Sequence, residues 1–281
     1  MVEKIPLRKT ITRLDFPAIV AFGNPLLDIL VILKNDELLK KYNLKIDGET
    51  ELCEEKMQEL IADLPSETEQ CTSPGGSAQN TLRILQWLCD ETHESQIGTF
   101  YGGIGSDQQG SILEKLVRIT GVDVRYAVHS TLPTGLCVSL VYESSRSLVA
   151  NLGAANIYTL NDLKKANLQL DSLKIIYIEG YFITHSLDVA KELVKRAQEK
   201  NIIIAFNLSG VYIFQIPPIV PKAPIVDTTG AGDALVAGFL AGVLAHWDPK
   251  SCLELGCKVA SYMITRLGVM LPSSIPPDLL P

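Results

Sequence analysis

The sequence predicts an α/β fold in which parallel strands are covered by helices on both faces. Two observations lead to this prediction. First, short apolar or β-branched segments alternate with longer segments whose apolar residues recur at helical spacing, a pattern typical of βαβ units with parallel strands. Second, a chain of 281 residues with 47% hydrophobic residues is long enough to bury a sizeable core, so we expect a single domain over 1–281.

The predicted elements follow each other in a regular order. The strand candidates are residues 17–23, 96–101, 173–178 and 201–206, and the helix candidates are residues 77–88, 111–119, 187–200, 233–246 and 251–266. Two other segments, about 31–53 and 135–152, combine partial alternation with turn residues. They predict a small sheet that stands off the main body.

Charge and composition argue against several classes of partner. Lys plus Arg is 25 and Asp plus Glu is 32, giving a net charge of −7 without a dense basic block, so we expect no nucleic-acid partner. No stretch approaches the ~20 apolar residues of a membrane span, and the first residues lack a signal-peptide core, so we expect no membrane contact and a cytoplasmic or nuclear location. Six scattered cysteines form no CxxC pair, which argues against a zinc site or a disulfide framework.

The segment DTTGAGD, residues 227–233, predicts an anion-binding turn. Gly230 and Gly232 let successive N–H groups point at one spot, and a helix begins there with the positive end of its dipole. The carboxylate of Asp233 would repel a phosphate, but it is suited to accept the proton of a hydroxyl while the N–H groups hold the incoming phosphoryl group. The alternative is an ordinary acidic residue in the first turn of a helix.

The stretch GNPLLDIL places two short polar side chains, Asn24 and Asp28, at the end of the first predicted strand. Open α/β sheets bind ligands at the carboxyl ends of their strands. A ribose has vicinal hydroxyls, and one carboxylate can accept hydrogen bonds from both. Taken alone, Asp28 is better explained as a turn residue.

The stretch SPGGSAQN contains Gly75 and Gly76, which permit close backbone approach. Ser77 is a candidate helix cap, and Asn80 lies one turn later on the same face, so the pair indicates either simple capping or a ligand contact. Arg146 is either a solvated arginine or a lid residue that closes over phosphate.

Two nucleotide-binding motifs are absent. The segment GGIGSDQQG, residues 102–110, resembles the dinucleotide fingerprint, but its third glycine falls at 110 instead of 108. No GxxxxGK[ST] pattern occurs either. The sequence therefore predicts neither nicotinamide binding nor a P-loop ATPase.

Together, these motifs occur in the order found in one family of enzymes. The chain resembles the ribokinase-like (PfkB) sugar kinases, and within them the adenosine kinases, in GNPLLDI, PGGSAQNTLRILQWL, GGIGSDQQGSILEKL, RSLVANLGAAN, IYIEGYFIT, FNLSG and DTTGAGDALVAGFLAG. The resemblance runs from about Ile19 to Leu267. It implies a doubly wound, mostly parallel sheet with helices on both faces and a small β-rich lid.

The resemblance also implies an activity, namely ATP-dependent phosphorylation of the 5′-hydroxyl of adenosine to AMP by a monomer, with ATP as co-substrate and Mg²⁺ as cofactor. Another nucleoside or a sugar is an alternative substrate. The roles it implies are catalytic base for Asp233, anion hole for Thr228, Gly230, Ala231 and Gly232, ribose contacts for Asn24, Asp28, Gly75, Gly76, Ser77 and Asn80, lid arginine near the phosphates for Arg146, and adenine stacking for Phe182. Metal ligands are not assigned.

The chain departs from the family pattern just before the DTTGAGD turn. The family normally has further β/α units there, with an Asn-x-x-Glu motif that helps to organise Mg²⁺ and part of the ATP pocket. Here a bridge, residues 210–226, fills that space with four prolines and no glutamate, whereas a βα crossover needs a dozen or more residues plus its strand.

The short bridge leaves two hypotheses open. The chain is either an active adenosine kinase or a catalytically impaired form that still binds nucleoside. In either case we expect weak ATP binding and a bare hydrophobic sheet edge at strand 201–206 or its partner.

Overall fold

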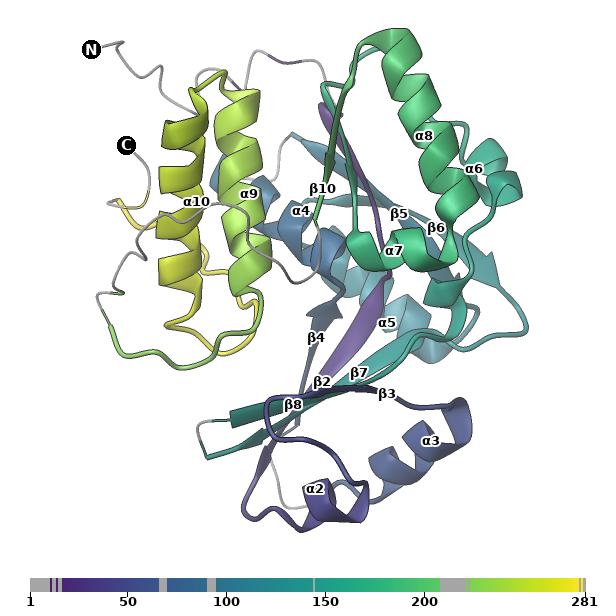
Figure 1. Ribbon diagram of the computed structural model, residues 1–281, viewed down its shortest axis with the longest axis vertical. Helices are drawn as coiled ribbons and strands as arrows, with labels where there is room; N and C mark the ends of the chain where they lie inside the picture. The colour runs from purple at the N-terminus through teal and green to yellow at the C-terminus, as the bar shows by residue number, and fades with distance from the viewer. Residues whose placement is uncertain are drawn as a thin grey trace.

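The computed structural model describes residues 11, 14, 17–65, 70–89, 95–143, 145–207, 221, 223–277 and 279. Within these ranges the chain forms two five-stranded sheets and the helices that pack on them (Figure 1). No helix in the same ranges combines the length and the apolar character needed to cross a membrane.

The main sheet is entirely parallel and has the strand order β10-β9-β1-β5-β6. Its strands are β1 (Ile19–Phe22), β5 (Gly98–Gly105), β6 (Asp123–His129), β9 (Ile175–Ile178) and β10 (Ile203–Phe206). The central strands β1, β5 and β9 are buried along their whole length, as expected for parallel strands covered on both faces. The carboxyl ends of all five strands therefore meet at one end of the sheet.

Helices cover both faces of this sheet. On one side lie α4 (Ser77–Cys89), α5 (Gln108–Arg118), α9 (Ala231–Leu244) and α10 (Pro249–Met263), and on the other α6 (Leu160–Ala166), α7 (Gly180–His185) and α8 (Leu187–Lys200) (Figure 1). Successive residues of β1 alternate between the two cores, since Ile19 and Ala21 belong to the first and Val20 and Phe22 to the second. The predicted fold class is confirmed.

The second sheet has the order β3-β8-β7-β2-β4 and mixes parallel and antiparallel pairs. It consists of β2 (Leu26–Leu33), β3 (Glu49–Glu51), β4 (Gln70–Gly75), β7 (Gly135–Tyr142) and β8 (Ser145–Asn151), with α2 (Glu37–Lys41) and α3 (Glu54–Ala62) packed on it (Figure 1). Both predicted insert segments contribute to this sheet. It also includes residues 26–30 and 70–75, which the sequence patterns did not assign to it.

In the described part of the chain, β10 is an edge of the main sheet. Its apolar side chains are poorly covered, since Ile203 is 52% and Phe206 57% exposed. Among the described residues, the prediction of a hydrophobic edge at strand 201–206 or its partner is confirmed for strand 201–206. Most of the bridge, residues 208–220 and 222, lies outside the described residues, so the prediction about its structure stays a prediction.

Candidate active site

Asp233 lies where α9 packs against α4, at the carboxyl end of the main sheet. The Ser77 hydroxyl donates a hydrogen bond to Asp233 Oδ1 at 2.7 Å, and the Asn80 side chain donates another to the same carboxylate. Burial raises the pKa of Asp233 to about 6, although these two hydrogen bonds and the charges of Arg146 and Arg83 oppose the increase. A carboxylate with this pKa is ionised at neutral pH and can still take up a proton.

Asp28, on β2, lies directly against the backbone of Gly75. A Cβ atom at Gly75 would lie 1.8 Å from Asp28 Oδ1, so a larger residue here would displace the Asp28 carboxylate. Burial raises the pKa of Asp28 to about 7, Arg83 lowers it, and the neighbouring charge of Asp233 raises it further. The two carboxylates therefore belong to one electrostatic cluster.

Asn24 follows β1 and lies under the Gly75–Gly76 turn. Gly76 has φ of +87°, and a Cβ atom there would lie 2.2 Å from the Asn24 carbonyl oxygen, so the turn requires glycine. Asn24 is only 2% exposed, yet neither polar atom of its side chain has a hydrogen-bond partner in the described structure. Because buried amides normally make hydrogen bonds, these unsatisfied atoms favour a ligand at this position.

The DTTGAGD turn has the geometry of an anion site. Gly230, with φ of +73°, caps α9, and a Cβ atom at Gly232 would meet nothing within 4 Å. The first N–H groups of a helix have no partner within the helix and carry the positive end of its dipole. The Ala231 N–H is an exception to the predicted set, because it donates to the Thr228 carbonyl at 3.2 Å inside the turn.

Arg146 connects the second sheet to this turn. It lies on β8, donates a hydrogen bond to the Thr229 hydroxyl and is 3.9 Å from Asp227 Oδ1. Asp227 in turn accepts hydrogen bonds from the backbone N–H groups of Thr229 at 2.9 Å and Gly268 at 2.8 Å. The predicted lid arginine is thus placed beside the predicted phosphate turn.

Phe182 does not join this group in the structure, so its stacking on adenine stays a prediction. Its side chain is fully buried, with ring centroids 6.0 Å from Phe22 and 5.8 Å from Tyr158. In this structure the ring therefore packs with the core residues on the α7 side of the main sheet.

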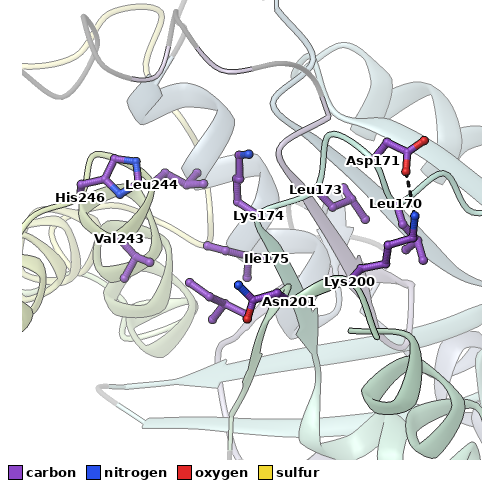
Figure 2. Close-up of a pocket in the computed structure, with 11 residues that line it drawn as sticks. Leu170, Asp171, Leu173, Lys174, Ile175, Lys200, Asn201, Val243, Leu244 and His246 are labelled. Atoms are coloured by element: carbon purple, nitrogen blue, oxygen red, sulfur yellow. Dashed lines mark hydrogen bonds and ion pairs between the residues drawn. The ribbon is translucent and has the colours of Figure 1, made fainter. Parts of the chain in front are cut away.

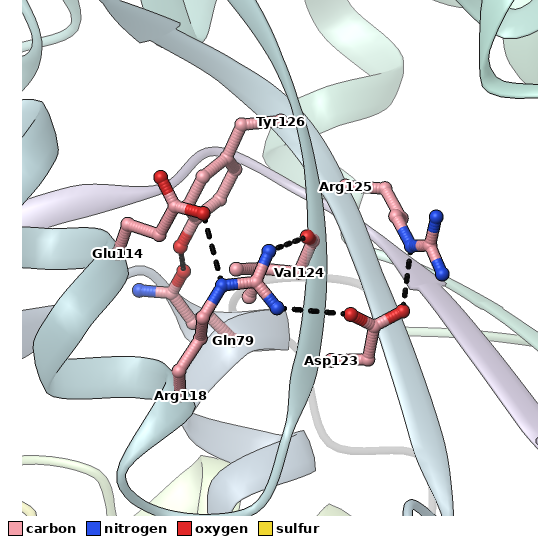
Figure 3. A network of polar contacts seen from close by, with 7 residues as sticks. All are labelled: Gln79, Glu114, Arg118, Asp123, Val124, Arg125 and Tyr126. Atoms are coloured by element: carbon pink, nitrogen blue, oxygen red, sulfur yellow. Dashed lines mark hydrogen bonds and ion pairs between the residues drawn. The ribbon is translucent and has the colours of Figure 1, made fainter.

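Several residues that the sequence reasoning missed hold parts of the site in place through hydrogen bonds. Gln79 donates to the Gly75 carbonyl at 2.8 Å and accepts a hydrogen bond from the Tyr126 hydroxyl. Figure 3 shows this contact beside the polar network that joins Arg118 of α5 to Glu114 and to Asp123 on β6. The glycine turn is therefore fixed to the main sheet.

Glu179 is a second such residue. It is buried at the end of β9 and accepts a hydrogen bond from the Ala78 N–H at 2.9 Å. Burial raises the pKa of Glu179 to about 8, with a further increase from Asp233. The only sequence signal for Glu179 is a lone carboxylate directly after an apolar run, at the sheet end where ligands bind.

The described residues do not form a protein cage for a metal ion. Within the ranges given above, no three His, Cys, Asp or Glu side chains are grouped closely enough to hold one. The Asp227 carboxylate is already engaged by backbone N–H groups and the Thr229 hydroxyl. The described residues therefore do not show where Mg²⁺ would bind.

A cavity of about 310 Å³ lies at the opposite end of the sheet. Figure 2 shows it between Ile175, the first residue of β9, and Leu244, at the end of α9. Ile203, the first residue of β10, also lines it. Lys200, which pairs with Asp171 at 3.2 Å, lies at its rim. Because the Asp233 cluster is at the carboxyl ends of the strands, this cavity is separate from the candidate site.

Comparisons with known proteins place the chain among kinases. Residues 51–209 and 203–276 match the family described as pfkB family carbohydrate kinase. Adenosine kinase 2 of Arabidopsis thaliana is 26% identical over 334 positions, covering 90% of this chain and 95% of that protein. The adenosine kinase of Dictyostelium discoideum is 33% identical over 223 positions, covering 78% of this chain and 64% of that protein. The solved structure of Anopheles gambiae adenosine kinase with di(adenosine-5) tetraphosphate has a TM-score of 0.76 and 27% identity, covering 91% of this chain and 97% of that one.

These matches also bear on the short bridge. The 334 positions aligned with the Arabidopsis protein exceed the 281 residues of this chain, so that protein contains segments without a counterpart here. The family match is divided into two parts that meet at residues 203–209, just before the bridge.

Proposed function

Since this chain belongs to the pfkB family of carbohydrate kinases, we propose that it transfers the γ-phosphoryl group of ATP to the 5′-hydroxyl of adenosine, which yields AMP and ADP. Two of its relatives and one solved structure, at 27% identity, support adenosine as the acceptor, since they are adenosine kinases. The observation that carries the proposal is a buried carboxylate, Asp233, in the first turn of the helix that begins at the glycine turn.

In this proposal Asp233 is the general base. It removes the proton of the 5′-hydroxyl as the hydroxyl oxygen attacks the γ-phosphorus, and the bond to the ADP leaving group breaks. The N–H group of Gly232 and the helix dipole stabilise negative charge on the transferred group. Arg146 adds positive charge from the second sheet.

The ribose would be held by groups on the opposite side of Asp233. Asp28 accepts hydrogen bonds from the ribose hydroxyls, and the unsatisfied amide of Asn24 supplies a donor and an acceptor. The glycines at 75 and 76 let the sugar approach the backbone closely. ATP as co-substrate and Mg²⁺ as cofactor are proposed from the family.

The comparisons do not favour the alternative of an impaired form that only binds nucleoside, because the relatives are kinases. Another nucleoside or a sugar as acceptor is tested by competition. The monomeric state and the cytoplasmic or nuclear location stay predictions from the sequence.

The test is transfer of labelled phosphate from ATP to adenosine by the purified chain with Mg²⁺, with AMP identified by chromatography and Asp233→Asn as the matched control. We expect AMP from the unmodified chain and a greatly reduced rate from the variant. Adenosine binding without AMP formation would support the impaired form. Transfer to another nucleoside or to free ribose, and not to adenosine, would show that the acceptor is not adenosine.

A further inference from the structure

A chain of hydrogen bonds leads from the start of α7 to Asp233. The backbone N–H of Gly180 donates to Asn207 Oδ1 at 2.7 Å, and Asn207 Nδ2 donates to Ser77 Oγ at 3.1 Å. The Ser77 hydroxyl then donates to Asp233 Oδ1 at 2.7 Å. Asn207 follows β10, α4 begins at Ser77, and Asp233 lies on α9, so the chain connects three elements that are far apart in the sequence.

The direction of these hydrogen bonds is fixed by their first member. A backbone N–H can only donate, so the atom of Asn207 that faces Gly180 must be the carbonyl oxygen. The amide nitrogen therefore faces Ser77 and donates to its oxygen. Because a hydroxyl has one proton, Ser77 is left to direct that proton to Asp233.

Asn80 is oriented in a similar way from the other side. The guanidinium of Arg83, which has donors and no acceptor, donates to Asn80 Oδ1 at 2.8 Å. The Asn80 amide nitrogen is thereby left to donate to Asp233. Both neighbours of the carboxylate are thus held in the donor orientation.

We propose that Asn207 is a positioning residue, which obliges Ser77 to donate to Asp233 and so keeps the buried carboxylate ionised and oriented. This rests on the proposed function, in which Asp233 must be unprotonated to accept the substrate proton. Hydrogen bonds from donors to the charged form stabilise that form and lower the pKa of the acid.

Other charged or titratable groups around Asp233 act in both directions. The surrounding groups are Arg83 on α4, Arg146 on β8, Asp28 on β2, Tyr177 on β9 and Glu179 before α7. The two arginines favour the ionised carboxylate, whereas Asp28 and Glu179 repel it when they are ionised. The hydrogen bond from Ser77 is therefore one of several opposing contributions to the pKa of Asp233, so its loss should change that pKa.

The variant Asn207→Asp tests the proposal with almost no change in shape. The new carboxylate can still accept from Gly180, but it cannot donate to Ser77, whose hydroxyl then turns toward residue 207. Asp233 loses a donor and gains a negative neighbour, so its pKa should rise by about one pH unit or more. The measurement is a carbon NMR titration of the whole chain with labelled aspartate carboxyl groups, in which Asp233→Asn assigns the signal.

The variant Ser77→Ala separates the effect of the hydrogen bonds from Asn207 through Ser77 to Asp233, called the relay here, from the effect of the added charge at residue 207. In Ser77→Ala the relay is already cut, so Asn207→Asp should raise the pKa of Asp233 by less than it does in the unmodified chain. The acidic limb of kcat/KM should move in the same direction as the NMR titration.

An unchanged pKa of Asp233 in a folded Asn207→Asp variant would overturn the proposal. If that variant does not fold, Ser77→Ala alone decides: its Asp233 pKa should be raised, and an unchanged value rejects the relay. The NMR titration needs no turnover, so a raised pKa in a chain that forms no AMP would support the relay and reject the proposed function.

Discussion

The two sides of Asp233 differ in how firmly the fold holds them. On the side proposed for the nucleoside, Ser77 and Asn80 belong to α4, a helix that is buried almost throughout. On the side that leads back from the glycine turn, Ile225 and Val226 are 60% and 58% exposed, and edge strand β10 is exposed as well. The acceptor side is thus built into the core, whereas apolar surface is left uncovered on the other side, at β10 and just before the glycine turn. Acceptor binding and donor binding should therefore respond differently to mutation.

The largest effect is expected on turnover, from a substitution of Asp233, the residue between the two sides. Asp233→Asn should lower kcat by roughly 10²–10⁴, because that is the usual contribution of a general base, while adenosine affinity changes little. Steady-state kinetics and calorimetric titration with adenosine measure the two quantities. Equal losses in turnover and in affinity would instead make Asp233 a structural residue.

A smaller effect, on adenosine affinity, is expected from a substitution on the acceptor side. Asp28→Ala removes the acceptor for two ribose hydroxyls and should weaken adenosine binding by about 2–3 kcal/mol, since hydrogen bonds to charged groups are the stronger ones. The control ligand is 2′,3′-dideoxyadenosine, whose affinity should fall much less. The same loss for both ligands would remove Asp28 from the site.

On the exposed side we expect weak ATP binding already in the unmodified chain. ATP should bind to this chain at least about tenfold more weakly than to an adenosine kinase that contains the additional segments, a difference on the order of 1.4 kcal/mol, whereas adenosine binds to both with similar affinity. Parallel calorimetric titrations of the two proteins test this. Ordinary ATP affinity in a well-behaved monomer would show that the bridge replaces the missing segments.

The smallest effect concerns the stability of the buried side. The folded-state pKa of Glu179 is about 8, above its ordinary value of 4.5, so the folded chain binds this proton more tightly than the unfolded chain. The free energy of unfolding should therefore decrease as the pH rises between these two values. Glu179→Gln keeps an acceptor for Ala78 without the titration, so its loss of stability from pH 6 to pH 8 should be smaller by on the order of 1 kcal/mol. Urea unfolding at both pH values measures the difference, and parallel losses would contradict the assignment.

The main sheet could be predicted from the sequence because its strands are apolar runs buried on both faces. Segment 173–178, for example, contains β9, and segment 187–200 coincides with α8. The strand β4 could not be found this way, because Pro74 and Gly75 weaken any strand pattern and its pairing with β2 depends on distant residues. Helix α5 begins three residues earlier than expected because the Asp107 side chain caps it by accepting from Gly110.

The candidate site was predictable where a motif carries the chemistry and not where contacts between distant segments do. Asp233 and Gly230 belong to one short motif, and their local geometry follows from it. Asn207 lies 130 residues from Ser77 in the sequence, so no spacing rule links them. The sequence also leaves the role of Phe182 open, because an aromatic residue in an apolar stretch can face either the core or a ligand, and only packing decides between the two.

The edge position of β10 also affects the exchange of its backbone hydrogens with solvent. In a parallel strand, alternate N–H groups point to opposite sides, and the Ile203 N–H donates to the Lys174 carbonyl at 3.0 Å, toward β9. The N–H groups of Ile204 and Phe206 therefore point to the side on which the described residues provide no neighbouring strand. Deuterium should enter these two positions much faster than Ile203 and Ala205, so one short strand would show a two-residue alternation in protection that a strand paired on both sides would not.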